Sequence, residues 1–396
     1  MNRREFLEGS LAAAFLAGCR SPLVGETCPK WRPGEFQIHC IYTGNAESTF
    51  WIFPDGTTML LDCGDTDTRK RNPAPMKLAK IGQAGDFIAR YVTRVNPAAD
   101  PTWVDYLMIS HHHDDHTGGL PAAIRTLHFR KAFDRDYPNY TYPCRLTDYD
   151  EKAKPFILDV YEKLRARDGL VVENLKVGAR DQVAALHGGA KGFSVFNLSA
   201  NGIIADERTG RTLDCYEKYP DRQPGFKGNK FGKQWINENG RSLGLIVRYG
   251  GFSYYTAGDF SDTPYGVVIE DLLAGVVPPV TVAKLNHHGY MSMPPKLVAA
   301  LRAKAYVNCV WNHNQNSAPT MKALSDRSLY PGDRRICPTF MTDRRPNDDV
   351  PAPAYEGAHL VLTVPPGGRD FTLRYLTADD DSLRVISEIH MASRSD

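Results

Sequence analysis

The stretch of sequence that decides the fold is His111-His112-His113-Asp114-Asp115-His116. It holds four of the twelve histidines of the chain within six residues. The run before it, Tyr106-Leu-Met-Ile-Ser110, is short and apolar and predicts a buried strand, and Thr117-Gly-Gly-Leu120 begins a helix. Because histidine and aspartate are metal ligands near neutral pH, this context favours a metal site over a histidine-rich solvated loop.

The spacing inside this run predicts two sets of ligands. His111 and His113 are separated by one residue, so on an extended loop both rings point the same way. Asp115 and His116 are adjacent, so they point to different sides and can serve a second metal. The two remaining members of the run, His112 and Asp114, are not expected to be direct ligands.

Three further motifs follow strand-like runs in the same chain. They are Leu60-Leu61-Asp62-Cys63-Gly64, Thr256-Ala257-Gly258-Asp259 and Lys284-Leu285-Asn286-His287-His288-Gly289. Each is weak alone, since an aspartate after a glycine is usually a turn residue. Together the three motifs are informative, because they occur in a fixed order along the chain and each lies at the end of a predicted strand.

On these four motifs the chain resembles the metallo-β-lactamase superfamily. The resemblance implies an α+β fold, an αββα four-layer sandwich, in which Asp62 orients a metal-binding histidine and Asp259 bridges two metals. It also implies that a late histidine completes the ligands of the second metal. His287 is favoured for that role because it directly follows the strand, and His288 is the alternative ligand, otherwise binding substrate or packing.

Within the superfamily the chain resembles the ComEC-like branch, the soluble hydrolase domain found in competence proteins. The shared features are the hairpin turn Pro54-Asp55-Gly56, the stretch Asn239-Gly-Arg-Ser-Leu243 and the ending His287-His288-Gly289. No membrane-channel segments accompany the domain, so a role in DNA uptake does not carry over.

The chain departs from this branch at three places. Tyr290 stands where serine is usual, and residues 44–48 replace the usual Gly-Gln-Gly of the opening hairpin. The third motif of the superfamily supplies a histidine, but the matching run at 196–201 has none. His128 and His187 lie in the right interval without a suitable strand before them, so the number of metals, one or two, stays open.

Strand-like runs gather at both ends of the chain, with helices between and after them, which favours two packed β-clusters over one alternating parallel sheet. Residues 76–95 and 153–167 are expected to be helical. Residues 129–150 are expected to form a long loop, and an insert at about 129–235 is expected to determine substrate specificity. The expected strands are 35–42, 48–53, 57–62, 106–110, 242–249, 252–256, 280–285, 305–310, 359–364 and 370–375.

The N-terminus predicts export. Arg3-Arg4 before Phe6-Leu7 resembles a twin-arginine signal, and the apolar run that follows is too short to span a bilayer. Leu16-Ala-Gly-Cys19 resembles a lipobox, in which Cys19 would be acylated; the alternative is a mildly amphipathic helix. The expected organisation is an export signal over 1–19, a tether over 20–34, a domain over 35–380 and a C-terminal tail over 381–396, with no transmembrane span in the mature chain. The expected location is the periplasm or cell envelope, with the lipid anchor contacting the membrane.

The composition of the chain argues against two kinds of function. The 396 residues carry a formal net charge of +2, which gives no strong overall attraction to nucleic acid or anionic membrane. None of the eight cysteines forms a C-x-x-C pair, which argues against a thiolate zinc site.

These features predict a hydrolase that uses water activated by one or two Zn²⁺ ions, with Mn²⁺ as an alternative. Asp115 is expected to accept a proton as well as bind metal, while Lys284, Asn239 and His313 are candidate substrate contacts. The branch resemblance implies a phosphodiester-type substrate, either a small molecule or an oligonucleotide. An ester, lactone or amide hydrolase and a non-catalytic metal-binding lipoprotein are the alternatives; a basic groove near Arg241 and Lys284 would favour the phosphodiesterase.

Overall fold

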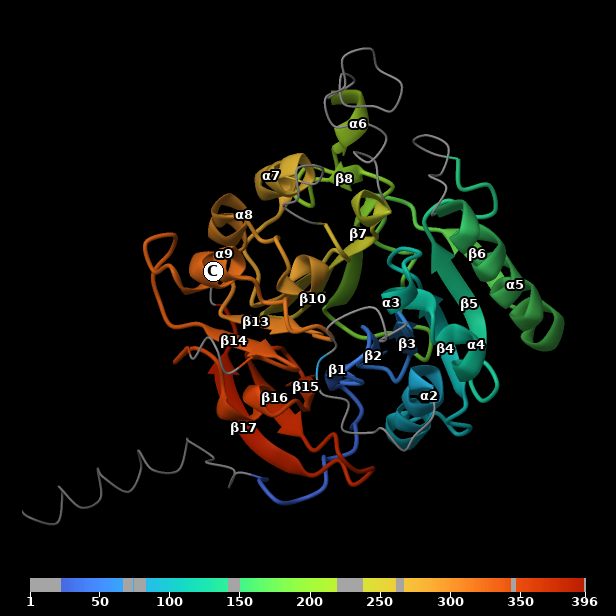
Figure 1. The fold of residues 1–396 in the computed structure, drawn as a ribbon, viewed down its shortest axis with the longest axis horizontal. Coiled ribbons are helices and arrows are strands. Elements are labelled where there is room, and N and C mark those ends of the chain that lie inside the picture. Colours follow the sequence, from blue (N-terminus) through green and yellow to red (C-terminus); the bar gives the residue numbers. More distant parts are fainter. Residues whose placement is uncertain are drawn as a thin grey trace, which may run out of the picture.

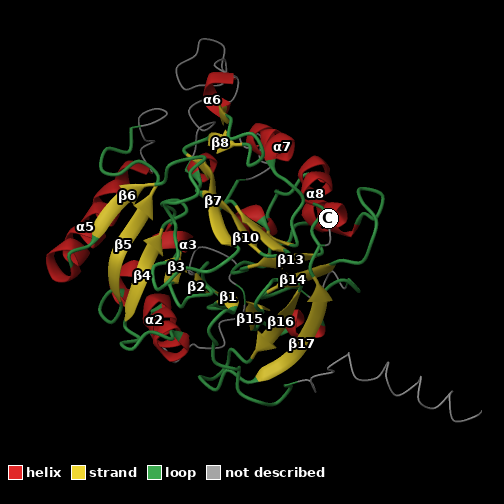
Figure 2. Cartoon of the chain, turned by 180° about the vertical axis from the view of Figure 1, so that it is seen from behind, coloured by secondary structure: helices red, strands yellow, loops and turns green. Residues whose placement is uncertain are grey.

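The computed structural model describes residues 23–66, 74, 83–141, 150–218, 238–260, 267–342 and 347–394. Within these residues the strands form two sheets, of nine and eight strands, packed face to face with helices outside (Figures 1 and 2). This arrangement confirms the α+β four-layer sandwich expected from the sequence.

The nine-stranded sheet carries the first two motifs. It pairs antiparallel from β17 to β3 and parallel from β3 to β6. In spatial order its strands are β17 (Val385–Ala392), β16 (Asp370–Leu376), β15 (His359–Val364), β1 (Phe36–Cys40), β2 (Thr49–Ile52), β3 (Thr58–Leu61), β4 (Trp103–Met108), β5 (His128–Asp134) and β6 (Val171–Asn174).

The eight-stranded sheet carries the last two motifs and is parallel from β11 to β14. In spatial order its strands are β14 (Arg335–Pro338), β13 (Ala305–Asn308), β12 (Val282–Lys284), β11 (Phe252–Thr256), β10 (Gly244–Tyr249), β7 (Phe193–Ala200), β8 (Ile203–Ala205) and β9 (Thr212–Asp214).

Alternating side chains fill the two layers of apolar core. On β2, Trp51 packs between the sheets, while Phe50 faces the helices outside the nine-stranded sheet. Helices α2 and α5 cover that outer face, and α7 and α8 cover the eight-stranded sheet (Figure 2). The helices are α2 (Ala84–Val95), α3 (Asp114–Thr117), α4 (Leu120–Ala123), α5 (Asp150–Asp168), α6 (Cys215–Lys218), α7 (Val267–Val276), α8 (Pro295–Leu301) and α9 (Ala318–Ser325), with 3₁₀ turns η4 (Asn239–Arg241), η5 (Asn286–Gly289) and η6 (Ala352–Tyr355).

The structure differs from the sequence-based expectation over 129–235. This range was expected to be an insert that opens with a long loop, but it contains β6 to β9 and most of β5. The loop prediction failed because β5 carries charged residues, yet it pairs in parallel with β4, and the Arg130 guanidinium lies 4.7 Å from the centre of the Trp103 ring. Residues 142–149 and 219–237 of the range lie outside the described residues.

The two ends of the domain also differ from expectation. The supposed tail at 381–396 contains β17, an edge strand of the nine-stranded sheet. The described part of the supposed tether joins it, since Gly25 N–H donates to the carbonyl of Val385 at 2.7 Å. Cys19 and the export signal lie outside the described residues, and among the described helices none has the length and apolar character needed to span a membrane.

Candidate metal centre

The parallel strands of both sheets end at one place, where the four motifs meet. Asp62 follows β3, the 111–116 run follows β4, Asp259 follows β11 and the His287-His288 pair follows β12. Ligand sites of α/β sheets commonly lie at the carboxyl ends of parallel strands. Here two sheets contribute such ends to one site.

His116 lies at the centre of this site. Its Nδ1 donates to Asp62 Oδ2 at 2.8 Å, and its Nε2 lies 3.1 Å from Asp259 Oδ2 and 3.3 Å from Nε2 of His288. Asp62 also accepts hydrogen bonds from Ser110 N–H and Oγ–H at 2.7 and 2.6 Å. Asp62 therefore fixes the His116 ring so that Nε2 faces the other ligand candidates.

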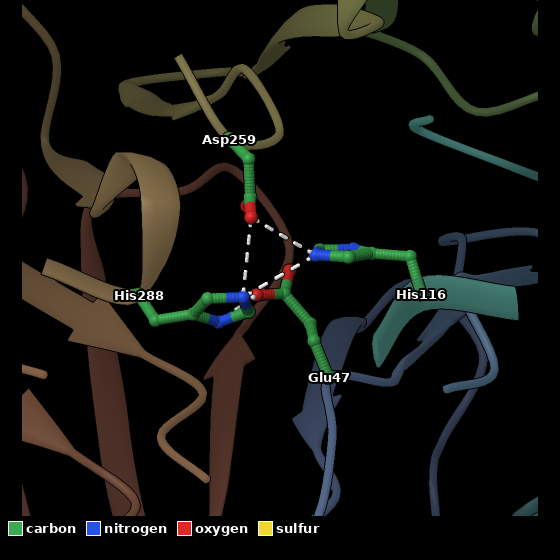
Figure 3. Close-up of side chains that lie close together, drawn as sticks. All are labelled: Glu47, His116, Asp259 and His288. Atoms are coloured by element: carbon green, nitrogen blue, oxygen red, sulfur yellow. Dashed lines mark hydrogen bonds and ion pairs between the residues drawn. The ribbon is translucent and has the colours of Figure 1, made fainter. Parts of the chain in front are cut away.

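His288, and not the favoured His287, completes the cluster with His116 and Asp259 (Figure 3). Its Nε2 lies 3.2 Å from both Asp259 Oδ2 and Asp115 Oδ2. The reason lies in the backbone, because residues 287 and 288 both have positive φ and do not continue the extended strand. The residue nearest the strand is therefore not the one that reaches His116.

Glu47 is a member of the cluster that the sequence did not reveal. Its Oε2 lies 3.0 Å from Nδ1 of His288, which also lies 3.0 Å from the Cys309 carbonyl. Both acceptors favour a proton on Nδ1, so Nε2 is left free to bind metal. Although Glu47 could itself be a ligand, this geometry assigns it to orienting His288, as Asp62 orients His116.

The loop that carries Glu47 is held against the 111–116 run. Glu47 N–H donates to the Asp115 carbonyl at 2.9 Å, and Gly64 N–H donates to the Glu47 carbonyl at 3.1 Å. A Cβ on Gly64 would lie 1.8 Å from the Asp115 carbonyl oxygen, so only glycine fits. The one available signal for Glu47 was its position in residues 44–48, where the chain departs from its branch.

His111 and His113 converge on the other side of Asp259. His111 Nε2 lies 3.1 Å from His113 Nδ1 and 3.8 Å from Asp259 Oδ2. The rings of this i, i+2 pair approach each other as the spacing predicted. One oxygen of Asp259 thus faces histidines of both sets.

The donor atoms fit divalent metal ions. His116 and His288 direct their Nε2 atoms toward each other and toward Asp259 while carboxylates hold both Nδ1 atoms, an arrangement that suits a divalent cation between them. Burial alone raises the pKa of Asp259, but the surrounding histidines outweigh it and hold the pKa well below its usual range. Asp259 is therefore an ionised ligand, and its Oδ1 is buried without a hydrogen-bond partner among the described residues.

Lys284 does not face the site as a substrate contact. Its ammonium is buried and lies 3.0 Å from Glu47 Oε1. Burial lowers the pKa of Lys284, but the Glu47 carboxylate outweighs this effect and the pKa is raised above its usual value. Arg241 is buried as well and pairs with Glu238 at 3.4 Å, so these two cations do not form the basic groove that would have favoured a phosphodiesterase.

A buried ion pair occupies the region where the third-motif histidine was sought. Asn201 follows β7 and donates from Nδ2 to the Arg135 carbonyl at 2.8 Å, and the Arg135 guanidinium makes two hydrogen bonds to Glu238 at 2.7 and 2.8 Å. His128 and His187 lie elsewhere, paired with Asp168 and Asp105 respectively. Neither histidine supplies the missing ligand.

A cavity of about 420 Å³ opens over the cluster. His113, Asp115, Asp259, His287 and His288 line its floor. Its walls contain the aromatic residues Tyr290 and Trp311 and the carboxamide residues Asn239, Asn312, Asn314 and Gln315. His313 packs edge-on against Phe340 while its two neighbours line the cavity, so Asn239 is the predicted substrate contact that the structure places in the wall.

The family model described as the metallo-beta-lactamase superfamily matches residues 42–178, which include Asp62 and the whole 111–116 run. The fold is that of the metallo-β-lactamases. The match supports the resemblance to the superfamily; the ComEC-like branch stays a prediction. A comparison with curated proteins finds no match.

Solved structures with similar folds are distant in sequence. A mutant of CmlA beta-hydroxylase has a TM-score of 0.35 and 13% identity over 76% of this chain and 50% of that one, so this chain spans about half its length. Tm1679, "a metal-dependent hydrolase of the beta-lactamase superfamily", has a TM-score of 0.38 and 13% identity over 76% and 96%. Zn²⁺-bound PqqB from Methylobacterium extorquens has a TM-score of 0.34 and 10% identity over 69% and 88%.

Proposed function

We propose that the protein is a metal-dependent hydrolase that binds two divalent ions, with Zn²⁺ as the first candidate and Mn²⁺ as the second. The observation that carries this proposal is the position of Asp259. Its Oδ2 lies 3.1 and 3.2 Å from Nε2 of His116 and His288, and 3.8 Å from Nε2 of His111. A carboxylate oxygen shared by two groups of histidines is the arrangement that a bridging ligand requires.

Divalent ions held by His111, His113, Asp115, His116, Asp259 and His288 would supply water activated at neutral pH and stabilisation of negative charge on oxygen. The residues of this chain accept a proton and orient the ligand side chains. Asp115 lines the cavity and is positioned to receive a proton from the attacking water. Asp62 and Glu47 keep the rings of His116 and His288 in place, so the ligand atoms need little reorganisation.

A phosphodiester is the first substrate class. The described lining holds the carboxylates of Asp114, Asp115 and Asp259 and no lysine or arginine, so two divalent ions would leave it with a net positive charge. A site of that charge would suit a phosphodiester anion, and two ions would supply charge stabilisation for both oxygens of its displacement.

An ester, lactone or amide is the second candidate, and one observation favours it. The described lining of the cavity contains carboxamides and aromatic rings but no lysine or arginine. Carboxamides hydrogen-bond neutral carbonyl and hydroxyl groups as well as anions, so this wall also suits an uncharged acyl substrate.

The test compares turnover of bis-p-nitrophenyl phosphate with that of p-nitrophenyl acetate and a simple lactone, each with Zn²⁺ or Mn²⁺. His116→Ala removes the central ligand and should abolish turnover, whereas His187→Ala, a histidine paired with Asp105 outside the cavity, should not. Preference for the phosphodiester supports the first class, and preference for the acyl substrates supports the second. Tight metal binding without turnover of any substrate would overturn the enzyme proposal in favour of a non-catalytic metal-binding lipoprotein.

Export and anchoring through Cys19 are part of the proposal. They rest on the Arg3-Arg4 pair and the Leu16–Cys19 run of the sequence. Metabolic labelling with a fatty acid, compared with Cys19→Ala, tests the anchor. Equal labelling of the wild-type and Cys19→Ala proteins would exclude Cys19 as the site of acylation.

A further inference from the structure

The His287-His288 pair has an unusual backbone. His287 has φ 45° and ψ 44°, and His288 has φ 52° and ψ 23°. Consecutive side chains on an extended chain point to opposite sides, but here both rings line the same cavity. Two neighbouring residues without glycine's freedom are held in the left-handed region, and such strain is typical of functional sites.

His288 has an assigned place beside Asp115 and His116, whereas His287 does not. The Nδ1 atom of His287 is buried and has no hydrogen-bond partner among the described residues. A buried polar atom of this kind requires a partner. The ring of His287 lines the same cavity as His113 and Asp259.

The His111 and His113 side of the site lacks a ligand. Besides the shared Asp259, the other side has Asp115, His116 and His288, whereas this side has His111 and His113, one protein ligand fewer. The end of β7 contributes Asn201 and the Arg135–Glu238 pair in place of a histidine. The cavity floor, however, brings His287 together with His113 and Asp259.

We propose that His287 supplies this missing ligand through Nδ1. One ion is then held by His111, His113, Asp259 and His287, and the other by Asp115, His116, Asp259 and His288. The two histidines of η5 thus serve different ions. This inference rests on the proposed function, because it requires that the site binds two metals.

Asn239 supports this role of His287 through a contact with Nε2, the other nitrogen of the ring. Its carboxamide nitrogen lies 3.4 Å from Nε2 of His287, and its Oδ1 is buried without a partner among the described residues. Rotation of the carboxamide by half a turn exchanges oxygen and nitrogen, and Nε2–H then donates to Oδ1. That hydrogen bond places the ring proton on Nε2 and leaves the Nδ1 lone pair for the ion.

The experiment titrates the metal-stripped full chain with Co²⁺ and follows stoichiometry and the absorption of bound cobalt. Wild type should bind two ions. His287→Ala should keep one and weaken the second by more than the roughly 10–100-fold that loss of an outer partner causes. Asn239→Ala should fall within that 10–100-fold range, and the matched control His187→Ala should behave as wild type.

A second measurement needs no variant. X-ray absorption at the zinc edge of the loaded wild type should give five imidazoles per two ions, whereas four would exclude His287. If His287→Ala binds both ions as tightly as wild type, this inference is overturned while the hydrolase proposal stands. If wild type binds only one ion, this inference fails together with the two-ion part of the proposed function, and the hydrolase activity is tested separately. If wild type binds no metal, both fail.

Discussion

Asp62 Oδ2 lies 2.8 Å from Nδ1 of His116, and the opposite nitrogen of that ring faces Asp259. Loss of such an outer carboxylate typically lowers metal affinity by roughly 10–100-fold. We therefore expect Asp62→Asn to weaken zinc binding by this factor in competition with a chromophoric chelator.

Asp134 offers a matched control for this variant. It is a buried aspartate that pairs with His112 at 3.1 Å, and His112 is not a proposed ligand. Asp134→Asn should lower stability without changing zinc affinity. Unchanged affinity in Asp62→Asn would contradict the role assigned to that carboxylate.

Glu47 and Lys284 form a buried ion pair that can be dissected. Glu47→Gln leaves the Lys284 ammonium buried without its counter-charge, which costs about 3–5 kcal/mol of unfolding free energy. Glu47→Gln combined with Lys284→Met should recover most of that stability in urea unfolding of the metal-free protein. Metal affinity should stay reduced in both variants, because His288 has lost the charged partner of its Nδ1.

This comparison separates two roles of one residue. If Glu47 only neutralises Lys284, the double variant regains full metal affinity. Equal stability of the single and double variants would show that the Lys284 ammonium costs nothing when it is buried without its counter-charge.

Two buried histidines away from the site predict acid sensitivity. His359 Nδ1 accepts the Tyr42 N–H at 2.9 Å, and His39 lies 3.0 Å from the Tyr91 hydroxyl. Burial lowers the pKa of both rings to about 3. The unfolded chain binds these protons near pH 6.5, so the stability is fully present above that pH and is lost as the pH falls toward 3.

Between pH 6.5 and pH 5 each ring should therefore cost about 2 kcal/mol of unfolding free energy. Urea unfolding of the metal-free protein at pH 7 and pH 5 measures this change. In His39→Gln the loss on acidification should be smaller by about 2 kcal/mol. An identical loss in wild type and variant would exclude His39 as a source.

Gly64 tests the packing of the motif loops. Since a Cβ there would lie 1.8 Å from the Asp115 carbonyl oxygen, Gly64→Ala must displace the backbone that carries Asp115. We expect lower thermal stability and weaker zinc binding. Gly275, in α7, has open space around its Cβ position, so Gly275→Ala should leave both unchanged or raise stability by about 0.5–1 kcal/mol. Equal behaviour of the two variants would contradict this account.

The sequence predicted the four-layer fold and the location of the site because both depend on local patterns. Short, nearly continuous apolar runs specify strands such as β2 and β15, and the motifs mark the ends of β3, β4, β11 and β12. The strands that were missed, β5 and β17 among them, carry charged residues and depend on long-range pairing. Local periodicity does not contain that information.

Within the site, residue types were predictable but their exact partners were not. The choice between His287 and His288 depends on two left-handed backbone positions that the strand pattern does not indicate. Lys284 seemed available to substrate because its partner, Glu47, lies far away in the sequence. Spacing therefore identifies candidate ligands, while tertiary contacts decide which side chain each of them faces.

The candidate ligands come from both sheets: Asp115 and His116 follow β4, whereas Asp259 and His288 follow β11 and β12. Ions held there would add a further link between the two sheets, beside the buried ion pairs Lys284–Glu47 and Arg135–Glu238. When metal is scarce, this link between the sheets would be lost, and the loops that carry the ligands would become more accessible to proteases. The working lifetime of the protein would then depend on metal supply, so that its abundance itself reports the metal status of the compartment.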